Sequence, residues 1–134
     1  MKNTIIIIII LIIIIGGSIF LQNSLNSIGE DLSKDLEELK NDVGYEKQKE
    51  NNNNTNNKLE GKAEIIYDKW EKESKKWAIF VLHEELDRLE TALINIKSTI
   101  QTEDFKETVK EINYAIFLVD SIKDKEKIKI KNLL

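Results

Sequence analysis

The sequence contains no cysteine and no proline, and it has only one histidine and five glycines in 134 residues. Without cysteine the chain has no disulfide, no thiolate nucleophile, no sulfur ligand for a metal and no residue that could carry a lipoprotein acyl chain. Its stability must therefore come from the packing of helices.

The charge balance gives no excess of basic residues. Charged residues make up 33% of the chain and the formal net charge is -4. A protein that binds nucleic acid needs clustered lysine and arginine to meet the phosphates, so this balance excludes a nucleic-acid partner. After an apolar leader, the length leaves room for one domain of roughly 110 residues.

An apolar run from Ile5 to Leu21 fills most of the segment 1–21, and ten of its first eleven residues are isoleucine. As a helix it would be about 25 Å long, just enough to cross a bilayer core with local thinning. The alternative is a cleaved signal peptide. However, the small residues at 16–18 are followed by further apolar residues, and no A-x-A pattern occurs. We therefore predict an uncleaved signal anchor, a single transmembrane helix.

The charges that flank this run predict its orientation. Lys2 and the amino terminus precede it, whereas Glu30 and Asp31 are the first charged residues after it. The positive-inside rule then places the N-terminus in the cytoplasm and the bulk of the chain on the extracytoplasmic side of the cell membrane.

The segment 22–44 is predicted to be an amphipathic helix with one narrow apolar stripe. Its apolar residues recur at spacings of three and four, as Leu25, Ile28, Leu32, Leu36, Leu39 and Val43. Polar Asn26 and Ser27, followed by Gly29, could act as a joint between the membrane and the domain, and Gly44 favours an end to the helix. The Asn-rich residues 45–58 contain no core-forming side chain and predict an unstructured linker.

The longest predicted element is a single helix from Leu59 to Ile100, around which the domain 59–134 is organised. At 1.5 Å per residue it would be on the order of 60 Å long and would need partners along its length. Its apolar stripe ends in a heptad seam and comprises Ala63, Ile66, Trp70, Trp77, Val81, Leu82, Leu86, Leu89, Leu93, Ile96 and Ile100.

A second helix, 103–123, is predicted to return along the first and complete an antiparallel hairpin. Thr102 is expected to cap it, and its stripe is Phe105, Val109, Ile112, Ile116 and Val119. The fold class is therefore all-α, a helical bundle built on a long hairpin behind the membrane anchor.

The last residues change their pattern. From Ile128 to Leu134 the apolar period is two instead of helical, and residues 123–131 hold five lysines and two acids. Three interpretations stay open: a solvated, frayed end, an extended tail docked on the bundle, or a basic segment attracted to anionic lipid headgroups.

Two runs of six residues, 77–82 and 114–119, are apolar on every side of a helix. A two-helix hairpin cannot bury both. The helix at 22–44, a second copy of the protein or another partner must cover the rest. We expect self-association, because two hairpins related by a two-fold axis make a four-helix bundle.

A candidate interaction patch lies on and near these runs: Trp70, Trp77, Phe80, His83, Glu84 and Phe117. Trp70 and Trp77 share one stripe, so their rings are expected to fill the space between helices. The alternative for both is an exposed binding anchor.

His83 is the only candidate for metal or acid–base chemistry. It shares a helix face with Asp87, but a stable site needs three or four ligands, so neither a metal nor another cofactor is predicted. We expect His83 to be hydrogen-bonded at the edge of the seam. No nucleophile motif or Gly-rich loop accompanies it, so no catalytic residue is predicted and the protein is not expected to be an enzyme.

Trp70, Trp77, the His83–Glu84 pair, the hairpin and the terminal Ile-x-Ile-x-Asn-Leu-Leu pattern at 128–134 occur together in this chain. In these features it resembles a bacterial family of short, N-terminally anchored proteins known as domain of unknown function 4363. The resemblance covers roughly 62–134 and the anchor. It implies an all-helical extracytoplasmic domain and brings no activity with it.

Two functions remain. The first is an interaction or structural module that assembles with itself or with another membrane protein at the outer membrane face. The second is a ligand-sensing helical domain. Since the predicted cytoplasmic part is only about four residues long, a sensor would have to signal through a partner, and we favour the first.

Overall fold

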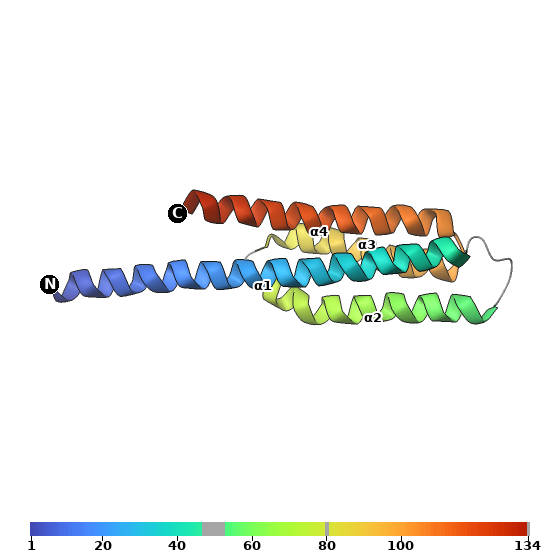
Figure 1. Cartoon of the computed structure of the whole chain (residues 1–134), viewed down its shortest axis with the longest axis horizontal. Coiled ribbons are helices and arrows are strands. Elements are labelled where there is room, and N and C mark those ends of the chain that lie inside the picture. The colour runs from blue at the N-terminus through green and yellow to red at the C-terminus, as the bar shows by residue number, and fades with distance from the viewer. Residues whose placement is uncertain (47–52, 80, 134) are drawn as a thin grey trace.

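The computed structural model describes residues 1–46, 53–79 and 81–133 and, within these ranges, contains four helices and no strand. In chain order the helices are α1 (Lys2–Glu46), α2 (Asn53–Trp77), α3 (His83–Gln101) and α4 (Phe105–Leu133). They alternate in direction along one long axis, and the first half of α1 projects from the end of the bundle (Figure 1). The all-α class is confirmed.

Each helix packs against two others, so the four close into one bundle. The contacts join α1 to α2, α2 to α3, α3 to α4 and α4 back to α1. The second half of α1 supplies one wall through the stripe predicted for it, of which Leu25, Leu32, Leu36, Leu39 and Val43 are buried. The four-helix bundle that the sequence suggested for two copies is thus built by one chain.

α1 runs without a break through the position where a joint was predicted. Gly29 is buried within this helix, where it faces α4. A Cβ atom added there would lie 2.6 Å from Lys123 Cδ and 3.4 Å from Val119 Cγ1. The joint prediction is wrong: Gly29 lets two helices approach closely.

The single helix predicted from Leu59 to Ile100 is also wrong, because the chain turns between α2 and α3. α2 ends at Trp77, and Leu82 has the extended backbone that precedes α3. No proline or glycine marks this turn. The turn lets α2 and α3 pack as antiparallel neighbours, and it buries Trp77 and Val81 while Ile79 and Leu82 stay exposed.

The Asn-rich segment is shorter than the predicted linker. α1 continues to Glu46 and α2 begins at Asn53, so parts of 45–58 are helical, and residues 47–52 lie outside the described ranges. Within α2 the apolar stripe begins at Leu59, which is buried together with Ala63 and Ile66. Packing of that stripe stabilises the polar first turns of the helix, which have little propensity of their own.

The turn between α3 and α4 spans residues 102–104. Glu103 has a positive φ of 57°, and the amide of Asp104 donates to Thr99 O at 2.9 Å, the pattern of a Schellman motif. Asp104 caps α4, since its Oδ1 accepts from the amide of Glu107 at 3.3 Å. Thr102 ends α3 instead of capping α4 as predicted.

α4 extends to Leu133, well beyond the predicted end near residue 123. Its buried row has helical spacing of four and three throughout: Thr108, Ile112, Ala115, Val119, Ile122 and Glu126. Because this row continues past residue 123, the chain stays helical and the extended tail is excluded for residues up to 133. Leu134 is outside the described residues.

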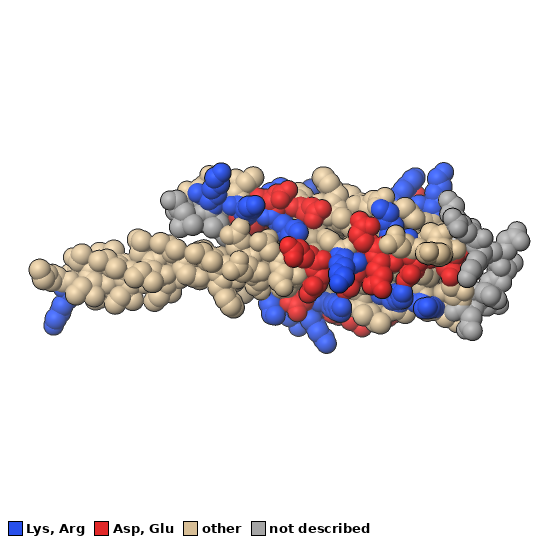
Figure 2. Space-filling model, viewed as in Figure 1, with Lys and Arg blue, Asp and Glu red and all other residues tan. Residues whose placement is uncertain are grey.

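The projecting half of α1 is long and apolar enough to cross a membrane, which is consistent with a signal anchor or a signal sequence. Its isoleucines from Ile5 to Ile14 are all at least half exposed. In Figure 2 this half is a stalk with almost no charged side chain, whereas acidic and basic side chains gather on the bundle.

Candidate functional site

The two tryptophans of the predicted patch lie in the core. Trp70 and Trp77 are 3% and 0% exposed, and their rings form an edge-to-face pair with centroids 5.3 Å apart and planes at 86°. This geometry is favourable for aromatic pairs and fills the space between helices, as the first interpretation predicted. Neither ring is a surface binding anchor.

His83 and Glu84 lie on the first turn of α3, exposed to solvent. Glu84 forms an ion pair with Arg88 one turn later on the same helix. Among the described residues His83 makes no hydrogen bond or ion pair, so the hydrogen bond predicted for it at the seam edge stays a prediction. No cluster of three or more ligand residues occurs in the described part of the chain.

Phe117 lies on the outer face of α4, where 64% of its surface is exposed, and Tyr114 one turn before it is 44% exposed. Phe80, the remaining member of the predicted patch, lies outside the described residues. The six residues therefore do not form one patch: the tryptophans are in the core, His83 and Glu84 begin α3, and Phe117 faces outward from α4.

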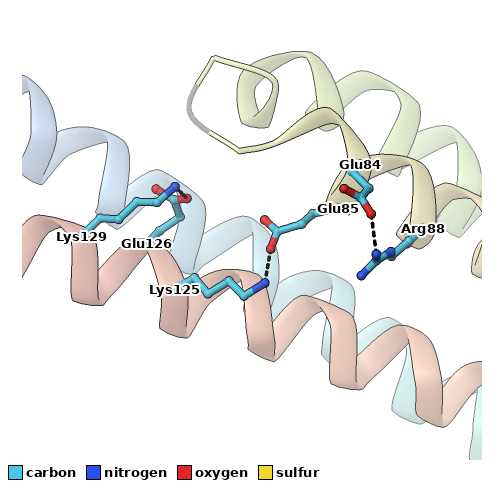
Figure 3. A network of polar contacts seen from close by, with 6 residues as sticks. All are labelled: Glu84, Glu85, Arg88, Lys125, Glu126 and Lys129. Carbon is cyan, nitrogen blue, oxygen red and sulfur yellow. Dashed lines mark hydrogen bonds and ion pairs between the residues drawn. The ribbon is translucent and has the colours of Figure 1, made fainter.

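The first turns of α3 and the last turns of α4 carry a group of ion pairs (Figure 3). Glu85 of α3 pairs with Lys125 of α4 and joins the two helices. On α4, the buried carboxylate of Glu126 pairs with Lys129 at 3.0 Å. Glu126 occupies a core position of the α4 stripe, so Lys129 partly compensates for the desolvation of its charge.

A family model described as domain of unknown function matches residues 19–133. The chain belongs to the DUF4363 family. The resemblance noted in the sequence is confirmed, and the match includes the half of α1 that lies in the bundle. No match was found among curated proteins or among solved structures.

The DUF4363 bundle also has a cleft of about 220 Å³ between α1 and α2, which was not predicted from the sequence. It is lined by Ile28, Asp31, Leu32, Asp35, Lys69, Trp70 and Glu73. Asp35 and Lys69 form an ion pair of 3.0 Å at this cleft, and the hydrogen bond raises the pKa of Lys69. The only sequence signal was the pair of acids at 31 and 35, one turn apart on the helix beside the stripe.

A second ion pair links the same helices farther from the apolar half of α1. Asp42 pairs with Lys62, and this hydrogen bond raises the pKa of the lysine. Lys97 of α3 pairs with Glu64 of α2 at 2.7 Å. These contacts link neighbouring helices of the DUF4363 bundle in a defined register.

Proposed function

We propose that this DUF4363 protein is a membrane-anchored, non-enzymatic helical module whose bundle stands on the extracytoplasmic face of the cell membrane. There it assembles with itself or with another membrane protein. The observation that carries the proposal is the continuity of α1, a single helix of 45 residues that passes from an uncovered apolar half directly into the bundle core. A retained anchor would hold the bundle at a defined height above the membrane.

The uncovered half of α1 supports the membrane part of the proposal. Its large apolar side chains from 5 to 14, with Ile19 and Phe20, are exposed, and only Lys2 and the amino terminus at its free end are charged. Burial in lipid removes this apolar surface from water, and the basic end favours the cytoplasmic side.

The outer face of α4 supports the assembly part. The bundle core is already closed by four helices, so a partner must bind side chains that remain outside it. Phe117 and Tyr114 form the apolar part of that face, and aromatic side chains are frequent anchors of protein interfaces.

Two measurements on intact cells test the proposal. Protease added outside should digest the bundle, and the mature chain should still begin before Ile5. Crosslinking followed by mass identification should recover a second copy or another membrane protein. Phe117→Asp should abolish this crosslink, whereas Ile94→Asp, a matched change at an exposed isoleucine of α3, should keep it. A protected bundle, or a mature chain that starts after Ser18, would contradict the proposed topology.

The α1–α2 cleft favours ligand sensing as a second candidate function. Its lining combines charged side chains, Asp31, Asp35, Lys69 and Glu73, with the apolar Leu32 and Trp70. At about 220 Å³ it lies below the usual size of a site for drug-sized ligands, roughly 300 Å³ or more, so only a small ligand would fit. Mass spectrometry of the purified full chain under native conditions would show such a ligand bound in the sensor case.

A further inference from the structure

The end of the bundle that faces the projecting half of α1 is formed by the turn between α2 and α3 and by the last turns of α4 (Figure 1). The turn between α3 and α4 lies at the opposite end. If α1 is inserted in a membrane as proposed above, the first end is directed toward the lipid.

The ion pairs between α1 and α2 locate the α2–α3 turn along α1. Asp42 of α1 pairs with Lys62 of α2, and Asp35 pairs with Lys69. Both pairs are seven residues apart on each helix, so the two antiparallel helices keep one register. Ten residues further in the same register, Ile79 lies at about the level of Leu25. That is four residues, or about 6 Å, beyond the end of the apolar run at Leu21. The headgroup layer on each side of a bilayer is also roughly 5 to 7 Å deep.

The contact at Gly29 locates the end of α4 in the same way. Lys123 lies against Gly29, and the two helices run in opposite directions. Val119 Cγ1 also lies 3.4 Å from a Cβ added at Gly29, so Gly29 is level with the stretch 119–123 of α4. Lys131, eight to twelve residues farther along α4, is therefore level with about residues 17–21 of α1, at the end of the apolar run. Lys127 is level with about residues 21–25 of α1. Both lysines are exposed.

The side chains at this level have the character of a membrane interface. Ile79 and Leu82 in the α2–α3 turn are 74% and 63% exposed, which is unusual for large apolar side chains. On α4, Ile128 is 59% exposed between Lys127 and Lys129. Apolar side chains next to lysines suit a layer of anionic headgroups above acyl chains.

We propose that the α2–α3 turn, through Ile79 and Leu82, and the last turns of α4, through Lys127 and Lys131, rest on the headgroups of the same membrane that holds α1. The occupant of this surface is anionic lipid. The bundle then has three points of contact with the membrane: the α1 span, the apolar turn and the basic helix end. This proposal rests on the anchored topology proposed above.

The absence of cysteine makes a direct depth measurement feasible, because each introduced cysteine is the sole labelling site. The full chain is reconstituted in vesicles of phosphatidylcholine mixed with phosphatidylglycerol, and a nitroxide is attached at Ile79→Cys. Matched labels are placed at Gln101→Cys, exposed at the opposite end of the bundle, and at Ile10→Cys in the apolar half of α1. Collision with oxygen, which concentrates in lipid, is compared with collision with a water-soluble nickel complex.

The expected result is that the label at position 79 favours oxygen severalfold more than the label at position 101. The double change Lys127→Glu and Lys131→Glu should reduce this preference. Lys106→Glu with Lys110→Glu, the same charge change at the opposite end of α4, should not reduce it. Vesicles of phosphatidylcholine alone should also give a weaker preference at position 79.

The three labels separate the two proposals. If position 10 reports lipid while position 79 behaves like position 101, the anchor is retained but the surface contact is refuted, and this end of the bundle is free for a protein partner. If position 10 reports water, α1 is not inserted and both proposals fail. Equal preference at position 79 with and without phosphatidylglycerol would refute the role of the lysines.

Discussion

Gly29 gives the sharpest test of how α1 is held in the bundle. The sequence pattern suggests a flexible joint at this residue, whereas in the structure it is a contact point between α1 and α4. A new Cβ would meet Lys123 Cδ at 2.6 Å and Cγ at 3.2 Å, and Val119 Cγ1 at 3.4 Å. The lysine side chain is flexible and can move aside, but Val119 is fully buried and cannot.

The magnitudes follow from these neighbours. Alanine in place of glycine in a helix interior gains about 1 kcal/mol in propensity, and displacing Lys123 offsets part of it. Gly29→Ala should therefore change the free energy of unfolding by less than about 1 kcal/mol. Leucine has nearly the same propensity, but its added atoms would push into Val119. Gly29→Leu should therefore destabilise the bundle by roughly 1 to 3 kcal/mol.

Gly61 provides the matched control, because it lies in α2, is exposed, and has no atom within 4 Å of an added Cβ. Both Gly61→Ala and Gly61→Leu should stabilise the protein by somewhat less than about 1 kcal/mol. The assay is urea unfolding of the full chain in detergent micelles, followed through the fluorescence of the two buried tryptophans. If Gly29→Leu proves as stable as Gly29→Ala, α1 and α4 do not pack closely here and the joint interpretation is restored.

Two further predictions concern the core and the pH dependence of stability. Leu89→Ala and Ile112→Ala, both at fully buried positions, should each cost roughly 2 to 5 kcal/mol in the same urea assay, and a loss below about 0.5 kcal/mol at both would contradict the observed packing of α3 against α4. The hydroxyl of Tyr67 donates to Glu90 Oε1 at 3.0 Å, which raises its pKa above the usual 10.0. The folded state then holds this proton more tightly than the unfolded state, so the contribution to stability is complete below pH 10.0 and is lost as the pH rises through the higher folded value. Tyr67→Phe should make the alkaline decline in urea midpoint shallower, and an unchanged decline would show that this hydrogen bond does not contribute to it.

The apolar stripes predicted from spacing are largely the rows that the structure buries. Leu36, Leu89 and Ile100 are examples, each no more than 1% exposed. Period alone locates such residues, because a helix brings positions three and four apart to one face. On α4 the predicted buried face is displaced around the helix axis from the observed one. Val109 and Ile116 are only partly buried, while Thr108, Ala115 and Ile122 belong to the core row. When two neighbouring rows of a helix have similar polarity, the sequence does not show which row is buried, because that depends on where the neighbouring helices lie.

The turn after Trp77 was missed because no breaker residue marks it. The one local sign was the predicted stripe itself, which advances by a single residue from Val81 to Leu82 before it resumes at Leu86. A continuous helix would move the stripe to a different face at that step. Turning instead lets both stripes face the same core, at the cost of leaving Ile79 and Leu82 exposed.

The described members of the predicted patch lie in separate places for a related reason. Trp77 and Phe117 belong to runs that are apolar on every side, and sequence cannot say which member of such a run turns inward. The structure buries Trp77 completely and exposes Phe117. The residues proposed to contact the membrane are instead far apart in the sequence: Ile79 lies in a turn and Lys131 lies near the end of α4. Their positions near the end of the apolar run of α1 depend on the register of three helices.

The sequence by itself determined the helical class, the apolar first segment, the family and most of the buried positions, because each of these depends on composition or on spacing within one element. Only the tertiary structure decided that α1 is the fourth wall of the bundle. A stripe such as Leu25 to Val43 shows that a helix needs a partner, but many apolar faces would satisfy it. The choice among them is made by contacts between elements: the ion pairs of Asp35 and Asp42 with α2, and the close approach of Gly29 to α4.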